Sequence, residues 1–189
     1  LIKRAQNISS NICNDLIKNK VIGLVRGKME FGPRALCNRS IIYKTSDFTV
    51  NKWLNKRLKR TETMPFAPVI REELCTKAFK QYSKQDTTLY FMTSTINCTK
   101  KFIDKSPAAV HIDSSARPQI VSKQRDLMMW SLLKKWEQKS GEMALLNTSF
   151  NVHKEPIVYN YEDALKSLVN GVIDVLYLNI FRITIRDLK

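Results

Sequence analysis

The chain has 189 residues, 43% of them hydrophobic, which suffices for the core of one ordinary domain and hardly for two. Lys and Arg number 32 against 17 Asp and Glu, and the formal charge of +15 favours anionic partners, unless the excess only solvates the surface. The sequence excludes a membrane span, because it has no apolar run of about 18 residues, and its cysteines show neither a metal clip nor a disulfide framework, so we expect a cytoplasmic protein.

A helix and a buried strand are predicted first. Apolar residues at Ile8, Ile12 and Leu16 repeat at helical spacing within residues 1–19, and residues 21–25 form a short apolar run typical of a strand. The strand leads into a turn that contains glycine and many charges. Ligands of open α/β sheets usually lie at such strand ends, so this turn is the first candidate site.

The candidate turn is the segment GKMEFGPRALCNRS, residues 27–40. Gly32 permits a sharp turn and Pro33 suits the first position of a helix, so we expect a helix to begin here. Free N–H groups at a helix start bind anions, which makes the segment a candidate receptor for phosphate or carboxylate; the alternative is a surface loop with incidental charge. Its candidate binding residues are Lys28, Arg34, Asn38 and Arg39.

Helical and strand patterns alternate along the rest of the chain, which predicts an α/β or α+β fold with a mixed sheet. Ser46 or Asp47 is expected to cap a second helix that ends near Leu58. Pro65 and Pro68 mark the next strand as an edge or irregular strand. Further helices are predicted at residues 71–82, 123–140 and 161–170, and strands at residues 66–70, 88–92, 143–146, 172–178 and 181–185.

Two further basic segments could hold phosphate groups. Lys59 and Arg60 lie where the second helix is expected to end, although basic residues there also complement the helix dipole. Arg117 stands in HIDSSARPQIV, residues 111–121, between a Ser-Ser turn and a proline. An arginine held at such a turn can bind a phosphate with two parallel hydrogen bonds. The single histidine and aspartate of this segment are too few for a metal site, so none is predicted.

The last polar segment is LLNTSFNVHKEPIV, residues 145–158, which follows a buried strand directly. Its short polar side chains suit oxygen-rich ligands such as phosphates and ribose, and they are also typical of an ordinary turn. Since three polar segments at strand ends can converge on one cleft, we expect a shared site that acts by charge and positioning rather than through a nucleophile. Its residues here are Asn147, Thr148, Ser149 and Asn151.

Together these segments resemble the C-terminal domain of the O-carbamoyltransferases that modify nodulation factors and antibiotics. The similarity lies in GKMEFGPRALCNRSI, NKRLKRTETMPFAPVI, HIDSSARPQIV and LLNTSFNVHKEPIV, which occur in the family's order within residues 21–178. The resemblance implies a YrdC-like fold, a twisted mixed β-sheet flanked by helices. It also implies that residues 1–189 form one domain of a longer enzyme, whose N-terminal actin-like domain binds metal and transfers the carbamoyl group.

The resemblance further implies a reaction. The domain would bind carbamoyl phosphate and ATP, with Mg²⁺ on the nucleotide, and would form carbamoyl-adenylate. The N-terminal domain would then pass the carbamoyl group to a small-molecule acceptor that bears a hydroxyl group. Lys59, Arg34 and Arg117 are the candidate catalytic residues. The candidate substrate- and nucleotide-binding residues are Lys28, Asn38, Arg39, Arg60, Asn147, Thr148, Ser149 and Asn151.

Four positions depart from the family's usual residues. Lys28 replaces the usual Arg, and Cys37, Ser114 and Lys154 stand where the family usually has Gly. We expect Cys37 inside the helix, where no Gly is required; the other two matter more, because Gly permits positive φ or the close approach of a ligand. Two alternatives stay open: a non-catalytic domain of the same fold, and a basic RNA-binding module, which the lack of interleaved aromatic and basic residues disfavours.

Overall fold

The structure is a computed structural model that describes residues 3–4, 7–61 and 65–187. Within these residues the main element is an eight-stranded mixed sheet. Its strands lie in the order β1-β10-β9-β2-β3-β8-β4-β7. The pairs β2–β9 and β4–β7 are parallel and the other neighbours are antiparallel. The strands are β1 (Lys3–Arg4), β2 (Ile22–Val25), β3 (Arg39–Lys44), β4 (Ala67–Arg71), β7 (Gln119–Val121), β8 (Ala144–Ser149), β9 (Val175–Leu178) and β10 (Phe181–Ile183).

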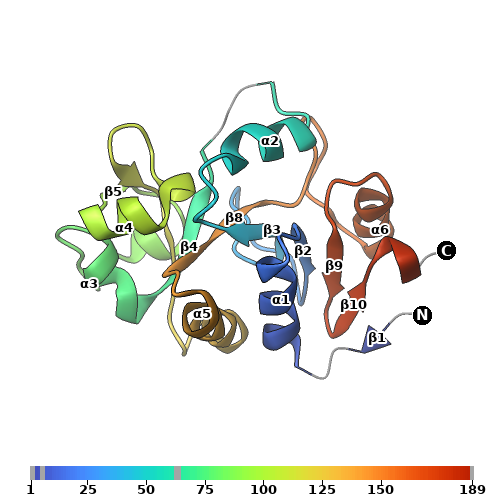
Figure 1. Cartoon of the computed structure of the whole chain (residues 1–189), viewed down its shortest axis with the longest axis horizontal. Helices are drawn as coiled ribbons and strands as arrows, with labels where there is room; N and C mark the ends of the chain where they lie inside the picture. The colour runs from blue at the N-terminus through green and yellow to red at the C-terminus, as the bar shows by residue number, and fades with distance from the viewer. Residues whose placement is uncertain (1–2, 5–6, 62–64, 188–189) are drawn as a thin grey trace.

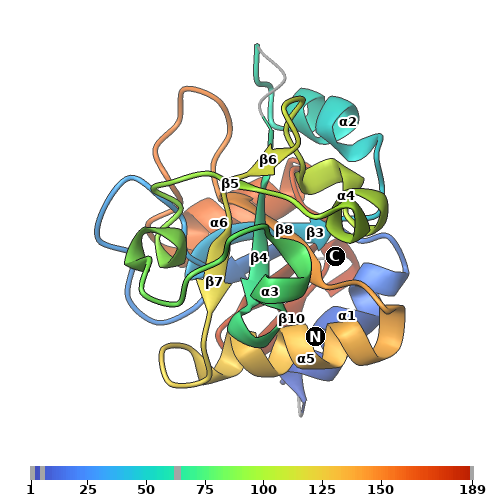
Figure 2. The ribbon, with the colours of Figure 1, turned by 90° about the vertical axis from the view of Figure 1, so that its left-hand side faces the viewer.

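Helices cover both faces of this sheet. Figure 1 shows α1 (Ile8–Ile17) and α5 (Leu127–Ser140) side by side below the sheet, and α2 (Val50–Arg57) above it. The helix α6 (Tyr161–Val169) packs against β9. A smaller part stands beside β4 and β7 (Figure 2). It contains α3 (Cys75–Ala78), α4 (Lys100–Lys105), the paired strands β5 (Ile96–Asn97) and β6 (Ser115–Ala116), and the 3-10 turns η1 (Glu72–Leu74), η2 (Thr87–Tyr90) and η3 (Pro107–Ala109).

Side chains that alternate along the strands divide the core into two layers. Ile42 and Val69 pack with α1 and α5, whereas the neighbouring Ile41 and Ile70 pack with α2 and α6. Successive side chains of a strand point to opposite faces, so a strand covered on both faces is apolar at consecutive positions. This explains the short apolar runs of the sequence and confirms a mixed α/β fold.

The helix expected after Pro33 is wrong. Residues 31–38 form turns, and β3 begins at Arg39, which pairs with Val25 of β2. Arg34 and Asn38 therefore lie in the loop between two paired strands. The run of buried residues in β3 fits between β2 and β8, and this burial of β-branched and aromatic side chains prevails over the local helix-start signal.

The carboxylate of Glu30 organises the loop between β2 and β3. Its Oε1 accepts the backbone N–H groups of Leu36, Asn38 and Arg39 at 2.7, 2.7 and 3.1 Å. We expected backbone N–H groups of this segment to be free for a ligand. A side chain of the same loop accepts these three instead, because an N–H group removed from water requires a partner.

Three other expectations are corrected. The strand β4 lies between β8 and β7 and not at an edge; Pro68 is accommodated because the ladder with β7 begins only at Val69. The helix expected at residues 71–82 is reduced to η1 and α3. The strand expected at residues 88–92 is replaced by η2 and the turn that follows it, and the Asp86 carboxylate caps η2 by accepting the Thr88 N–H at 3.0 Å. The strands β1, β3 and β7 and the helix α4 were not predicted.

The remaining predicted elements are confirmed, most of them shorter than expected. The helix α1 occupies only residues 8–17 of the predicted span, of which residues 1–2 and 5–6 lie outside the described part. The helix α2 begins at Val50, beyond both expected caps. The helix α5 begins after Asp126, which accepts the Met129 N–H at 3.0 Å, and ends at Gly141 in the left-handed conformation.

Candidate functional site

A pocket of about 230 Å³ lies where the three polar segments meet. Its walls come from the β2–β3 loop, the segment between α2 and β4 with the start of β4, Met92, the segment before β7, and β8 with the turn that follows it. Most of the predicted site residues line it, namely Arg34, Arg60, Arg117, Asn147, Thr148, Ser149 and Asn151. The structure thus brings together side chains that are far apart in the sequence.

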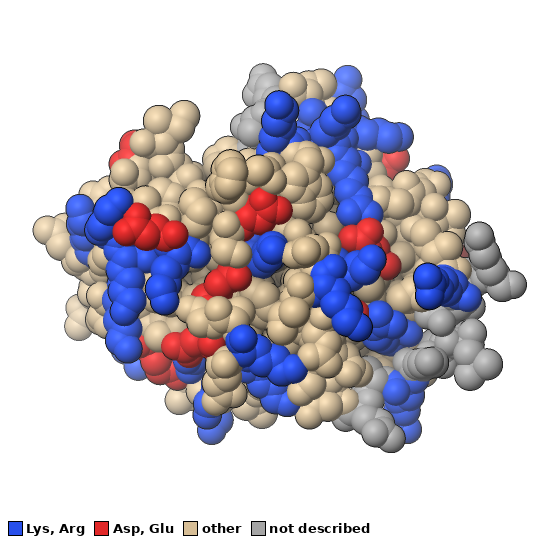
Figure 3. Space-filling model, in the orientation of Figure 1, with Lys and Arg blue, Asp and Glu red and all other residues tan. Residues whose placement is uncertain are grey.

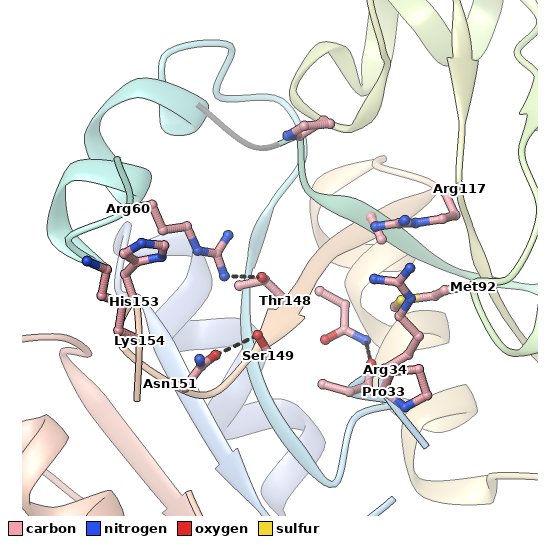
Figure 4. A pocket seen from close by; sticks show the side chains of 14 residues that line it. Pro33, Arg34, Arg60, Met92, Arg117, Thr148, Ser149, Asn151, His153 and Lys154 are labelled. Carbon is pink, nitrogen blue, oxygen red and sulfur yellow. Dashed lines mark hydrogen bonds between the residues drawn. The ribbon is translucent and has the colours of Figure 1, made fainter. Parts of the chain in front are cut away.

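The arginines stand on opposite sides of the pocket. Figure 4 shows Arg34 and Arg117 on one side and Arg60 on the other, with Thr148 and Ser149 of β8 between them. A ligand on β8 would therefore meet guanidinium groups from two directions.

The pocket is strongly positive. None of the residues that line it is acidic, and no ion pair among the described residues involves Arg34, Arg60 or Arg117. Burial lowers the pKa of Arg60, and burial together with the nearby charge of Arg34 lowers the pKa of Arg117. Both shifts mean that the surroundings disfavour the positive charges of these arginines, so an anion bound beside them would stabilise the charged forms.

Neutral groups hold Arg60 in place. Its Nη2 donates to Thr148 Oγ1 at 2.9 Å, and its guanidinium lies 5.5 Å from the centre of the Phe66 ring. These contacts fix the position of the guanidinium without neutralising its charge.

Side-chain hydrogen bonds hold the turn after β8 in place. Ser149 Oγ donates to Asn151 Oδ1 at 2.6 Å (Figure 4), and Asn151 Nδ2 donates to the backbone oxygen of Glu155 at 2.9 Å. His153 and Lys154 of the same turn also line the pocket. We did not predict these two, although they follow Asn151 directly in the polar segment.

Four predicted site residues do not line this pocket. Arg39 is buried, and its Nη1 donates to the backbone oxygens of Arg26 and Asn38, each at 3.0 Å, so it braces the loop. Asn38 Nδ2 donates to the backbone oxygen of Lys28 at 3.0 Å, and the Lys28 side chain is exposed. Lys59 is exposed and lines a neighbouring pocket of about 360 Å³, which shares Asn151 with the first.

All three positions where the family usually has Gly adopt positive φ. The φ angles of Cys37, Ser114 and Lys154 are +75°, +64° and +67°. The expectation that Cys37 lies in a helix, where no Gly is required, is therefore wrong. Burial raises the pKa of the Cys37 thiol to about 12, so it stays protonated. These departures keep the loop conformations that glycine would adopt, at a cost in strain.

The described residues contain no cluster of three or more His, Cys, Asp or Glu side chains that could hold a metal ion. Within the same residues, no helix has the length and apolar character needed to cross a bilayer. On the face shown in Figure 3, Lys and Arg are interspersed with Asp and Glu and do not gather into one basic surface, which does not favour binding along a nucleic acid there.

Sequence comparisons agree with the four motifs. The model of a family described as Carbamoyltransferase C-terminus matches residues 13–184. An uncharacterized protein of Methanocaldococcus jannaschii is 36% identical over 95% of this chain and 34% of its own length. Nodulation protein NolO of Bradyrhizobium diazoefficiens is 32% identical over 95% of this chain and 33% of its own length. A 3'-hydroxymethylcephem-O-carbamoyltransferase of Amycolatopsis lactamdurans is 32% identical over 78% of this chain and 27% of its own length. The chain thus spans only 27–34% of the length of these relatives.

Solved structures share the fold. Full-length HypF in a phosphate- and nucleotide-bound form has a TM-score of 0.66 at 19% identity, over 93% of this chain and 25% of that chain. A Sua5 from P. abyssi has a TM-score of 0.56 at 9% identity, over 87% of this chain and 44% of that chain. Identities this low show the fold alone, and they confirm the expected YrdC-like sheet. The match over residues 13–184 and the relatives above 30% identity establish more: the chain belongs to the family of carbamoyltransferase C-terminal domains.

Proposed function

We propose that this domain binds carbamoyl phosphate and ATP and forms carbamoyl-adenylate. The observation that carries the proposal is the pocket around Thr148 and Ser149, where Arg34, Arg60 and Arg117 meet without any carboxylate. Family membership supports a carbamoyl ligand, and the phosphate- and nucleotide-bound form of HypF supports phosphate groups on this fold.

The charge of the pocket suits the difficulty of this reaction. Carbamoyl phosphate would first be hydrolysed, with water cleaving its phosphate linkage so that inorganic phosphate leaves and carbamate remains. A carbamate oxygen would then bond to the α-phosphorus of ATP as the bond to pyrophosphate breaks and pyrophosphate leaves, so the step brings a carbamate group against a triphosphate. Both reactants are anions that repel each other. Arg34 and Arg117 from one side and Arg60 from the other would offset this repulsion and hold the reacting groups together.

The size of the pocket supports our placing only the reacting ends of the ligands in it. A volume of about 230 Å³ is smaller than the roughly 300–1,000 Å³ usual for larger organic ligands. We therefore place carbamoyl and phosphate groups in it and the nucleoside outside its mouth. Because no lining residue is acidic, Mg²⁺ would be held by phosphate oxygens and water rather than by this chain's side chains.

Transfer to the hydroxyl acceptor is assigned to another part of the complete protein. The chain spans 27–34% of the length of its relatives, which leaves room for the N-terminal actin-like domain implied by the family. The acceptor would then be recognised mainly outside this domain.

Carbamoyl-phosphate-dependent exchange of ATP with labelled pyrophosphate, measured in the complete protein with Mg²⁺, tests the proposal. We expect Arg117→Ala to lower exchange by about 100-fold or more, because a charge that stabilises the transition state is lost. The control Arg186→Ala removes an exposed arginine outside the pocket and should exchange like the wild type. Unchanged exchange in Arg117→Ala would show that the pocket does not take part in the reaction. Absence of exchange in the wild type would refute adenylate formation.

A further inference from the structure

The side-chain amide of Asn147 has one possible orientation. Its Nδ2 lies 3.0 Å from the backbone oxygen of Ala35, which can only accept a hydrogen bond, so the atom facing that oxygen must be the nitrogen. The same nitrogen lies 2.7 Å from a side-chain atom of Gln119, which must then be the acceptor Oε1. The backbone thus determines the orientation of both amides.

Gln119 is well placed to hold this arrangement. It is only 5% exposed, and Asn147 is 1% exposed, so no bulk water competes for the bond between them. The Cys37 thiol donates to the same Oε1 at 3.3 Å. A buried thiol and a backbone oxygen therefore frame a pair of amides that cannot rotate without losing bonds.

The orientation leaves one acceptor of a pocket-lining residue without a partner. Asn147 Oδ1 is buried and has no hydrogen-bond partner among the described residues. Asn147 lines the same pocket as Arg34 and Arg117. A buried acceptor without a partner is unfavourable, and a ligand that donates a hydrogen bond to it would gain binding energy. The pocket therefore combines positive charge for an anion with an acceptor for a donor group.

We infer that Asn147, oriented jointly by the backbone oxygen of Ala35 and by Gln119, binds the NH₂ group of a carbamoyl ligand and so selects carbamoyl compounds over acyl compounds of the same shape. The inference rests on the proposed function. Carbamoyl phosphate carries an amide N–H donor next to an anionic group, which are the two features that the pocket complements. Acetyl phosphate has the same shape but presents a methyl group, which cannot donate a hydrogen bond. In this view Gln119 is a positioning residue.

Two stable phosphonates form a matched pair of probes. Phosphonoacetamide has an NH₂ group where acetonylphosphonate has a methyl group, and both carry the same phosphonate. We expect calorimetry on the complete protein to show that the amide binds roughly 5- to 150-fold more tightly, which corresponds to one buried acceptor gaining or lacking its partner.

Variants of Gln119 separate positioning from a general loss of structure. Gln119→Met keeps the length of the side chain but offers Asn147 only a weakly accepting thioether sulfur. The affinity ratio should therefore fall to about threefold or less while acetonylphosphonate affinity changes little. Gln119→Glu still accepts from the amide and should keep the ratio, although its negative charge weakens the binding of both anions. Gln124→Met, at an exposed position, is the matched control and should keep the wild-type ratio.

The outcomes distinguish the inference from the proposed function. Equal binding of the two phosphonates to the wild type overturns the inference and leaves the proposed function standing. A ratio in Gln119→Met equal to that of the wild type overturns the role of Gln119. Binding of neither phosphonate overturns both proposals. Circular dichroism shows whether each variant is folded. If Gln119→Met is unfolded, the affinity ratios of the wild type and of Gln119→Glu test the inference instead.

Discussion

Replacing Ser114 with Gly should make the protein more stable. Ser114 is exposed, its φ is +64°, and its hydroxyl has no hydrogen bond among the described residues. Two backbone hydrogen bonds hold it in place: its N–H donates to the backbone oxygen of His111 at 2.9 Å, and its carbonyl oxygen accepts from the backbone N–H of Cys98 at 2.9 Å. The substitution therefore removes strain at this position without removing a contact.

The expected gain follows from two opposing effects. A residue other than glycine in the left-handed region costs about 1–2 kcal/mol. The greater freedom of glycine in the unfolded chain offsets about 0.5–1 kcal/mol of this. Ser114→Gly should therefore raise the free energy of unfolding by about 0.5–1 kcal/mol, or Tm by about 1–4 °C for a domain of this size.

Urea denaturation followed by tryptophan fluorescence measures this change. Ser114→Ala is the matched control, since it removes the hydroxyl but keeps the strained backbone, and it should stay within about 0.5 kcal/mol of the wild type. Gly141→Ala places a side chain at a φ of +75° and should lose about 1 kcal/mol. If Ser114→Gly is no more stable than Ser114→Ala, positive φ does not explain why the family usually has glycine at this position.

Three further substitutions test the fold and the loop beside the pocket. In Gly23→Ala the new Cβ would lie 2.5 Å from Ile173 Cδ1, so thermal denaturation should show a loss of about 1–3 kcal/mol. Burial opposes the charge of Asp174, but Arg57 and a backbone N–H group outweigh it and lower the pKa of Asp174 below 3.8. The charged form thus stabilises the fold above pH 3.8; Asp174→Asn should be less stable at pH 7, and acid titration should show the gap closing as the pH falls through the lowered pKa. Glu30→Ala leaves three partly buried N–H groups without their acceptor and should cost about 2 kcal/mol or more, with weaker phosphate binding by calorimetry; equal phosphate affinity would show that the loop does not need this carboxylate.

The chemistry of the candidate site could be predicted from the sequence because its polar and basic residue types gather in short segments within or next to strands. Arg117 and Asn147 were predicted from their own segments, and both line the pocket. Lys59 and Arg39 were predicted with the same reasoning, but Lys59 lines a neighbouring pocket and Arg39 bonds to backbone oxygens of its loop. Residue type indicates what a side chain can bind, whereas its direction depends on how the loop and strand are packed.

The sequence alone determined the alternation of strands and helices, the excess of positive charge and the segments that carry polar chemistry, because these depend on local pattern and composition. Only the tertiary structure decided that residues after Pro33 enter a strand, since β3 gains its stability from β2 and β8 on either side. It also decided that Gln119 reaches Asn147, although 28 positions separate them. Such contacts arise when distant segments are buried together, and no window of the sequence contains them.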